Sequence, residues 1–87
     1  MVDYNSFIGK FLCHRKNAPM TDGFIFKITS TRIYYTNTGD RWITKDDFEH
    51  RTGLDGSTWF WVQDTPIDPY WWSPKIIEQI KKDKKLI

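Results

Sequence analysis

The chain offers few side chains that could act as a nucleophile, a general base or a metal ligand. Its one cysteine, Cys13, is followed directly by His14, and its other histidine is His50. Neighbouring residues of a strand point to opposite faces, so Cys13 and His14 are not expected to form a thiolate–imidazole pair. We expect Cys13 to be a small buried apolar residue and His50 to be solvated.

The acidic residues also lack the spacing of a catalytic or metal site. Asp64 and Asp68 stand four positions apart with a proline between them, a context that favours turns over a fixed pair of carboxylates. No Cys-x-x-Cys, His-x-x-x-His, calcium-loop or glycine-rich phosphate-loop pattern is present in the sequence. We therefore predict a non-catalytic protein with no metal and no cofactor.

Aromatic residues interleaved with basic ones point to binding instead. The 87 residues include 5 tryptophans, 4 tyrosines and 6 phenylalanines, more than so small a core readily hides, so some are expected at the surface. Tyrosine, tryptophan and arginine are the residue types enriched among the energetic anchors of protein interfaces. The predicted partner-binding residues are Tyr34, Tyr35, Arg41, Trp42, Trp71 and Trp72.

The same region allows a second interpretation, which is binding of RNA or single-stranded DNA. Aromatic rings can stack on bases while lysine and arginine neutralise phosphates. The residues predicted for this alternative are Lys27, Arg32, Tyr34, Arg41 and Trp42. Salt dependence separates the two interpretations, because phosphate contacts weaken steeply with salt and aromatic protein contacts do so much less.

The distribution of charge favours a protein partner over nucleic acid. The net charge is +2, and it divides into +3 for residues 1–39, −4 for residues 40–70 and +3 for residues 71–87. So small a net charge does not imply nucleic acid on its own. We predict a macromolecular partner and favour a protein over nucleic acid. The oligomeric state stays open.

Cysteine usage and hydropathy indicate the compartment. A lone cysteine excludes an intrachain disulfide, which favours a reducing environment. No apolar run approaches the roughly 20 residues of a membrane-spanning helix, and the N-terminus lacks a signal-peptide pattern. We therefore expect the cytoplasm and no membrane contact.

Short strands must position the binding residues. Asn37–Asp40 is typical of a hairpin turn with Gly39 at positive φ, whereas residues 17–23 are typical of a loop. The polar residues 29–32 indicate a tight turn, or alternatively a bulge in one long strand. The predicted strands cover residues 7–14, 24–28, 33–36, 41–44 and 59–62.

Residues 58–72 hold four of the five tryptophans and organise the rest of the chain. Aromatic and aliphatic side chains alternate over residues 59–62, so both faces of that strand are apolar and need cover. Two adjacent residues ahead of a helix cannot fill the same pocket. We therefore expect one of Trp71 and Trp72 to anchor the following helix and the other to be partly exposed.

Two helices are predicted from their first residues. Thr44 begins a capping signature and starts a helix over about residues 45–52, which Gly53 ends. Ser73 caps a second helix, with Pro74 at its first position, over about residues 74–84. The residues expected to dock this C-terminal helix are Ile76, Ile77 and Ile80.

The predicted fold is mostly β, of the α+β class: a small five-stranded bent antiparallel sheet or a barrel, with the two helices added. Over roughly residues 7–62 the pattern of strands and turns resembles an SH3-like barrel, in the broad sense that includes KOW and Tudor modules. The residues that carry this resemblance are Ile8-Gly9-Lys10, Gly23–Ile28, Ile33-Tyr34-Tyr35 and Trp42-Ile43-Thr44. SH3-like barrels bind either proteins or nucleic acids, so the resemblance supports both interpretations.

We predict a single domain over residues 1–87, with a barrel at 7–62, a proline-rich connector at 63–73 and a C-terminal helix at 74–87. The segment Thr38–Glu49, whose sequence is TGDRWITKDDFE, is similar to small bacteriophage accessory proteins. That resemblance implies a viral protein that binds and modulates, for example inhibits, a host protein in the host cytoplasm.

Overall fold

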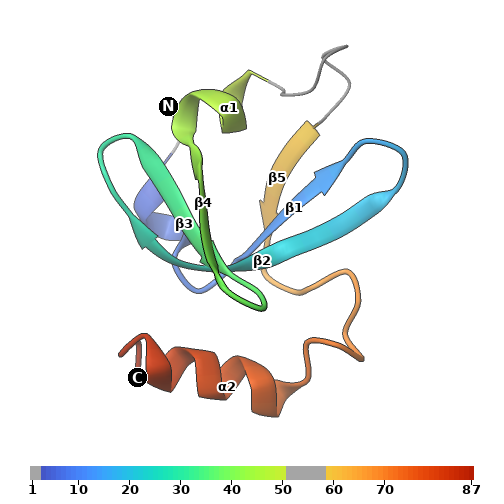
Figure 1. Ribbon diagram of the computed structural model, residues 1–87, viewed down its shortest axis with the longest axis vertical. Coiled ribbons are helices and arrows are strands. Elements are labelled where there is room, and N and C mark those ends of the chain that lie inside the picture. Colours follow the sequence, from blue (N-terminus) through green and yellow to red (C-terminus); the bar gives the residue numbers. More distant parts are fainter. Residues whose placement is uncertain (1–2, 51–58) are drawn as a thin grey trace.

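The computed structural model describes residues 3–50 and 59–87, and in them five antiparallel strands form one sheet (Figure 1). The strand order is β4-β3-β2-β1-β5, and the sheet does not close between β4 and β5 in the described residues. The strands are β1 (Phe11–Arg15), β2 (Pro19–Ile28), β3 (Arg32–Thr36), β4 (Asp40–Thr44) and β5 (Trp59–Gln63). The helices are the 3-10 helix η1 (Tyr4–Phe7), α1 (Lys45–Glu49) and α2 (Pro74–Asp83). The predicted mostly β fold is confirmed in its form as a bent antiparallel sheet.

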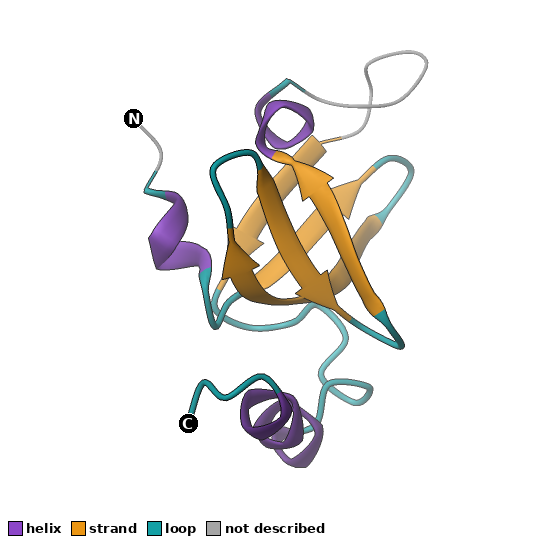
Figure 2. Ribbon diagram, turned by 60° about the vertical axis from the view of Figure 1, so that its left-hand side comes forward, coloured by secondary structure: helices purple, strands orange, loops and turns teal. Residues whose placement is uncertain are grey.

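The sheet bends around β2, which gives it a concave inner face and a convex outer face. Helix α1 lies at the open end of the inner face, and α2 runs beneath the outer face (Figures 1 and 2). The inner face buries Leu12, Ile25 and Ile33, against which η1 and α1 also place aromatic side chains. The outer face has its own core, made of Phe11, Cys13, Phe24 and Trp72. A sheet with apolar residues on both faces needs this cover on both sides.

Two irregularities in β2 decide which side chains face which way. The pairing with β1 shifts register between Leu12 and Cys13, and the extra residue on β2 is Asp22. The pairing with β3 shifts between Ile25 and Lys27, and the extra residue is Phe26. A bulge breaks the strict alternation of faces and re-aims the inserted side chain. Asp22 consequently joins His14 on the inner face, and Lys27 joins Phe26 and Tyr34 on the outer face.

Helix α2 docks on the outer face through residues that differ in part from the prediction. The Oγ of Ser73 accepts a hydrogen bond from the Ile76 amide at 3.3 Å, which confirms the predicted helix start. Ile77 and Ile80 pack on the outer core as expected, but Ile76 is exposed. Leu86, just beyond the helix, takes the third docking position. The prediction for Ile76 is wrong because the connector sets the helix with its 77–80 side toward the sheet.

Several predicted strand limits are also wrong. Phe7 belongs to η1, because Gly9 has a φ of 90° and turns the chain before β1 begins. Strand β2 begins at Pro19, well inside the predicted loop. Proline is tolerated there because it is the first residue of the strand. Gly39 follows β3 as predicted, but its φ is not positive.

Helix α1 begins at the predicted cap. The Oγ1 of Thr44 accepts a hydrogen bond from the Asp47 amide at 2.9 Å. The helix ends at Glu49, three residues earlier than predicted, and the predicted end at Gly53 lies outside the described residues. No helix in the described part of the chain is both long and apolar enough to cross a membrane.

The cap of α1 yields a first testable prediction. We expect Thr44→Ala to lower the free energy of unfolding by about 1 kcal/mol, because one amide of the first turn loses its acceptor. Urea melts should show a lower midpoint with an unchanged slope. Thr38→Ala, in the exposed turn between β3 and β4, is the matched control and should leave the midpoint unchanged. Equal midpoints for the two variants would show that the hydroxyl of Thr44 does not cap the helix.

Candidate functional site

The outer face of β2, β3 and β4 carries a group of aromatic and cationic side chains beyond the end of α2. Tyr34 on β3 lies directly opposite Trp42 on β4, and the ring of Phe26 lies 6.3 Å from that of Tyr34. Trp42 is 47% exposed, and it lies on an edge strand of the sheet. We call this group the outer aromatic face, and it consists of Phe26, Lys27, Arg32, Tyr34 and Trp42.

The cations of the outer aromatic face lie over its rings. The guanidinium carbon of Arg32 is 3.9 Å from the centre of the Trp42 ring, and its Nη1 donates to the Tyr34 hydroxyl at 3.3 Å. The ammonium of Lys27 lies 5.4 Å from the centre of the Tyr34 ring. Such contacts are attractive, and they are strongest for arginine over tryptophan. Arg32 therefore has a fixed orientation before any partner arrives.

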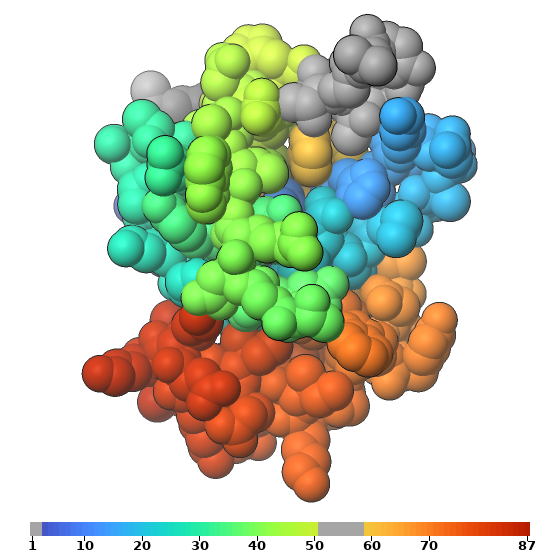
Figure 3. All heavy atoms as spheres, in the orientation of Figure 1, coloured from blue at the N-terminus to red at the C-terminus, as the bar shows by residue number. Residues whose placement is uncertain are grey.

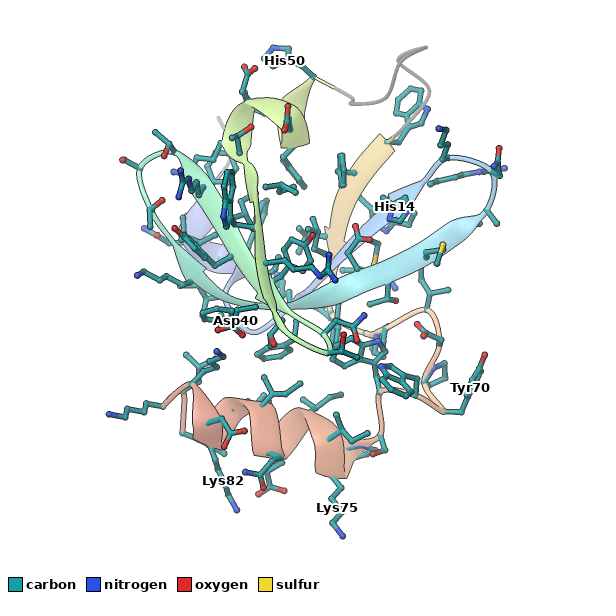
Figure 4. The ribbon with its side chains drawn as sticks, in the orientation of Figure 1. His14, Asp40, His50, Tyr70, Lys75 and Lys82 are labelled. Carbon is teal, nitrogen blue, oxygen red and sulfur yellow. The ribbon has the colours of Figure 1, made fainter. Side chains whose placement is uncertain are left out.

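The C-terminal end of α2 borders the outer aromatic face. Lys84 places its ammonium 4.2 Å from the centre of the Phe26 ring and 2.6 Å from Asp40 Oδ2. The hydrogen bond from Lys84 lowers the pKa of the Asp40 carboxyl below its ordinary value. Figure 3 shows the turn between β3 and β4 resting on α2, and Figure 4 shows Asp40 at that junction. This ion pair ties the helix to the turn that begins β4.

Comparison with known protein families, with curated proteins and with solved structures finds no match for this chain. The resemblances to SH3-like barrels and to bacteriophage accessory proteins therefore stay predictions. The function has to be inferred from the side chains themselves and from their geometry.

The structure brings together some of the predicted binding residues and separates others. Lys27, Arg32, Tyr34 and Trp42 share the outer aromatic face, so four of the five residues predicted for nucleic acid are neighbours. The fifth, Arg41, pairs with Tyr35, which packs on the core of the inner face.

The predicted protein-binding set is divided among three places. Tyr34 and Trp42 lie on the outer aromatic face, while Tyr35 and Arg41 lie on the inner face. Trp71 and Trp72 precede α2, where Trp72 is 2% exposed and belongs to the outer core, and Trp71 is 48% exposed. The expectation that one of these two tryptophans anchors the helix is confirmed. Because Trp72 is buried, it is a core residue and not a surface contact.

A polar cluster on the inner face was not anticipated from the sequence. His14 Nδ1 lies 2.6 Å from Asp22 Oδ1, across the bulge between β1 and β2. Burial raises the pKa of the Asp22 carboxyl, and His14 counteracts part of that rise. Burial, and then the charge of Asp22, raise the pKa of Tyr35, with Arg41 acting in the opposite direction. The sequence does not reveal this pair, because residues 17–23 are typical of a loop and only the pairing of β2 with β1 brings Asp22 beside His14.

Cavities of about 230 Å³ and 240 Å³ flank this cluster, and both are lined by Asp22 and Tyr35. Cys13 is not part of the cluster: it faces the outer core, which confirms that it and His14 point to opposite sides of the sheet. Burial is the main cause that raises the pKa of the Cys13 thiol, to about 11. A thiol with that pKa is protonated at neutral pH and is a poor nucleophile. Within the described residues, no group of three or more His, Cys, Asp or Glu side chains could hold a metal ion.

Proposed function

We propose that the chain is a non-catalytic interaction module that binds a protein partner through the outer aromatic face. The observation that carries this proposal is the half-exposed Trp42 indole with the Arg32 guanidinium stacked on it and held by the Tyr34 hydroxyl. Tryptophan, tyrosine and arginine dominate the binding energy of protein interfaces. Here all three side chains are already ordered, so a partner pays little conformational entropy to use them.

The placement of the cations supports a protein partner over nucleic acid. Lys27 and Arg32 both lie over aromatic rings, so those ring faces are covered and not free to stack on bases. Lys84, the third cation at this face, is paired with Asp40. Arg32 donates to Tyr34 through Nη1 and has other N–H groups left for a carboxylate of the partner. The partner surface that fits is therefore apolar at its centre and carries an acidic side chain.

Binding of RNA or single-stranded DNA is the second candidate function. It is favoured by the fact that four of the five residues predicted for it meet on one face, where rings and cations alternate. Such a face would neutralise phosphates and stack on bases only if the cations moved off the rings. Its affinity would then fall by orders of magnitude between about 50 and 200 mM salt if many phosphates were contacted.

The wider biological role follows from the sequence resemblance alone. A small bacteriophage accessory protein would bind a host protein and change that protein's activity by covering part of its surface. We propose this role for the chain, with the outer aromatic face as the covering surface.

The second testable prediction concerns Trp42. We expect Trp42→Ala to weaken protein binding about 30-fold, because truncating an interface hot spot costs about 2 kcal/mol or more. Trp59→Ala is the matched control, since Trp59 is 49% exposed and lies on β5, at the opposite edge of the sheet. Partners captured from a nuclease-treated bacterial lysate would be purified, and their affinity for wild type and both variants measured by calorimetry.

The same proteins also test the alternative. Binding of labelled oligo(dT) and oligo(U) is followed by anisotropy over about 50 to 200 mM salt. If the chain binds the oligonucleotides in a salt-sensitive way and Trp42→Ala abolishes that binding, the function is nucleic-acid binding and not protein binding. Equal protein binding by Trp42→Ala and Trp59→Ala would show that the partner does not bind at the outer aromatic face.

A further inference from the structure

A third cavity lies between the start of β2 and the connector that leads to α2. Its volume is about 310 Å³. Tyr70, on its rim, projects away from the body of the protein (Figure 4). The residues that line the cavity are Pro19, Met20, Thr21, Ile67, Asp68 and Tyr70.

Two side chains of the cavity lining are largely apolar and strongly exposed. Met20 is 56% exposed and Tyr70 is 90% exposed. The amide of Ile67 donates to Thr21 Oγ1 at 2.8 Å, which fixes the connector to β2 and gives the cavity a defined shape. Exposed apolar side chains around a formed cavity are typical of a binding site.

Asp68 is the one charged side chain of the lining. Its Oδ1 is buried and has no hydrogen-bond partner among the described residues. A buried acceptor without a donor is unfavourable, and a carboxylate oxygen is more so than a neutral one. The backbone carbonyl of Asp68 accepts from the amides of Trp71 and Trp72, so the turn that holds the side chain is itself ordered. The Asp68 carboxylate therefore has acceptor capacity that no described residue uses.

We propose that this cavity binds a lysine or arginine side chain of a protein partner. The aliphatic stem lies against Met20 and Ile67, and the cationic head donates to Asp68. The ring of Tyr70, on the rim of the cavity, adds a cation–π contact to the same head. A negative carboxylate inside apolar walls selects for a cation on an apolar stem and against a phosphate or a carboxylate.

This site is independent of the outer aromatic face. None of its lining residues belongs to that face. The charges are also reversed: the cavity offers the Asp68 carboxylate to a cationic partner residue, whereas the outer aromatic face offers the Arg32 guanidinium to an anionic one. A partner that carries both features would dock along the outer side of the protein, across α2. The cavity can also bind its basic residue when nothing occupies the outer aromatic face.

The test, which is the third prediction, uses N-acetyl-lysine amide and N-acetyl-arginine amide as probes in an NMR titration. We expect saturable shifts of the Met20 methyl and Tyr70 ring signals, with a Kd on the order of 1 mM, as for a single side chain without the rest of a partner. N-acetyl-norleucine amide, which has the stem without the charge, should bind at least tenfold more weakly. Asp68→Asn should weaken the lysine probe tenfold or more.

Three controls keep the test decisive. Asp64→Asn removes an exposed carboxylate of the same connector, which pairs with Lys10 at 3.5 Å. This substitution should leave probe binding unchanged. Tyr70→Ala cannot disturb the core, since Tyr70 is almost fully exposed, and it should weaken the probe severalfold. Trp42→Ala should bind the probe as tightly as wild type does, because Trp42 is not part of the cavity lining. The cavity site can therefore be confirmed even if the outer aromatic face binds no partner.

Equal affinity for the lysine and norleucine probes would overturn the proposal, as would unchanged binding in both Asp68→Asn and Tyr70→Ala. A concentration-dependent dimer that Asp68→Asn abolishes, seen by analytical ultracentrifugation, would also overturn it, because the occupant would then be a second copy of this chain.

Discussion

Replacing Trp72 by alanine is expected to lower the free energy of unfolding by about 3–5 kcal/mol. Trp72 is 2% exposed, and its ring lies 5.3 Å from that of Phe11 in an edge-to-face arrangement. It fills the space between the sheet and the side chains of Ile77 and Ile80. The substitution leaves a large cavity there, and a helix of 10 residues is too short to persist without its packing. Because a domain of this kind is stable by only about 5–15 kcal/mol, we expect the Trp72→Ala variant to unfold on mild heating.

Urea melts followed by far-ultraviolet circular dichroism measure this effect. Trp71→Ala is the matched control, because Trp71 is the adjacent tryptophan but is about half exposed. This substitution should lower the free energy of unfolding by less than about 1 kcal/mol. The free energy of unfolding of Trp72→Phe should lie between those of the two alanine variants, since phenylalanine keeps an aromatic ring and removes an indole N–H that has no partner among the described residues. Similar losses for Trp71→Ala and Trp72→Ala would contradict the anchoring role of Trp72.

The parts of the fold that could be predicted are those with local signals. The caps at Thr44 and Ser73 depend on a hydroxyl and the next few amides, and both are present. The alternation over 59–62 also survives: Trp61 packs on the outer core, while Phe60 and Val62 pack on the inner one. These patterns are fixed within a few residues, so the rest of the chain does not alter them.

The parts that could not be predicted depend on partners distant in sequence. Residues 19–23 contain typical turn formers, yet pairing with β1 extends them into a strand. The choice of Leu86 over Ile76 as a docking residue depends on how the connector sets α2 against the sheet. Local propensity carries no information on either contact.

The candidate site was predictable in part. Tyr34 and Tyr35 are adjacent in a strand, so period-two geometry alone places them on opposite faces, and the same rule separates Arg41 from Trp42. Applied to the predicted binding set, that rule would have divided it correctly. The membership of Lys27 in the outer aromatic face was not accessible in this way, because the bulge at Phe26 breaks the alternation between Ile25 and Lys27.

Gly23→Ala is expected to destabilise the protein by about 3 kcal/mol. A Cβ at this position would lie 2.6 Å from the carbonyl oxygen of Thr36 and 2.7 Å from Cδ2 of Tyr35. The carbonyl belongs to the backbone of β3, which is held in register by the pairing of Thr36 with Phe24, so it cannot move aside without breaking the sheet. In a domain of this size, the loss should lower Tm by roughly 12–24 °C.

Gly39→Ala provides the control that isolates this steric cause. Its Cβ would meet nothing within 4 Å, and its φ lies outside the left-handed region, so alanine fits there without strain. We expect Gly39→Ala to leave Tm unchanged or to raise it slightly, because alanine reduces the entropy of the unfolded chain. Calorimetric scans of the two variants should therefore move in opposite directions or differ by more than about 10 °C. If Gly23→Ala melts at the same temperature as Gly39→Ala, the close approach of β2 to β3 at Gly23 is wrong.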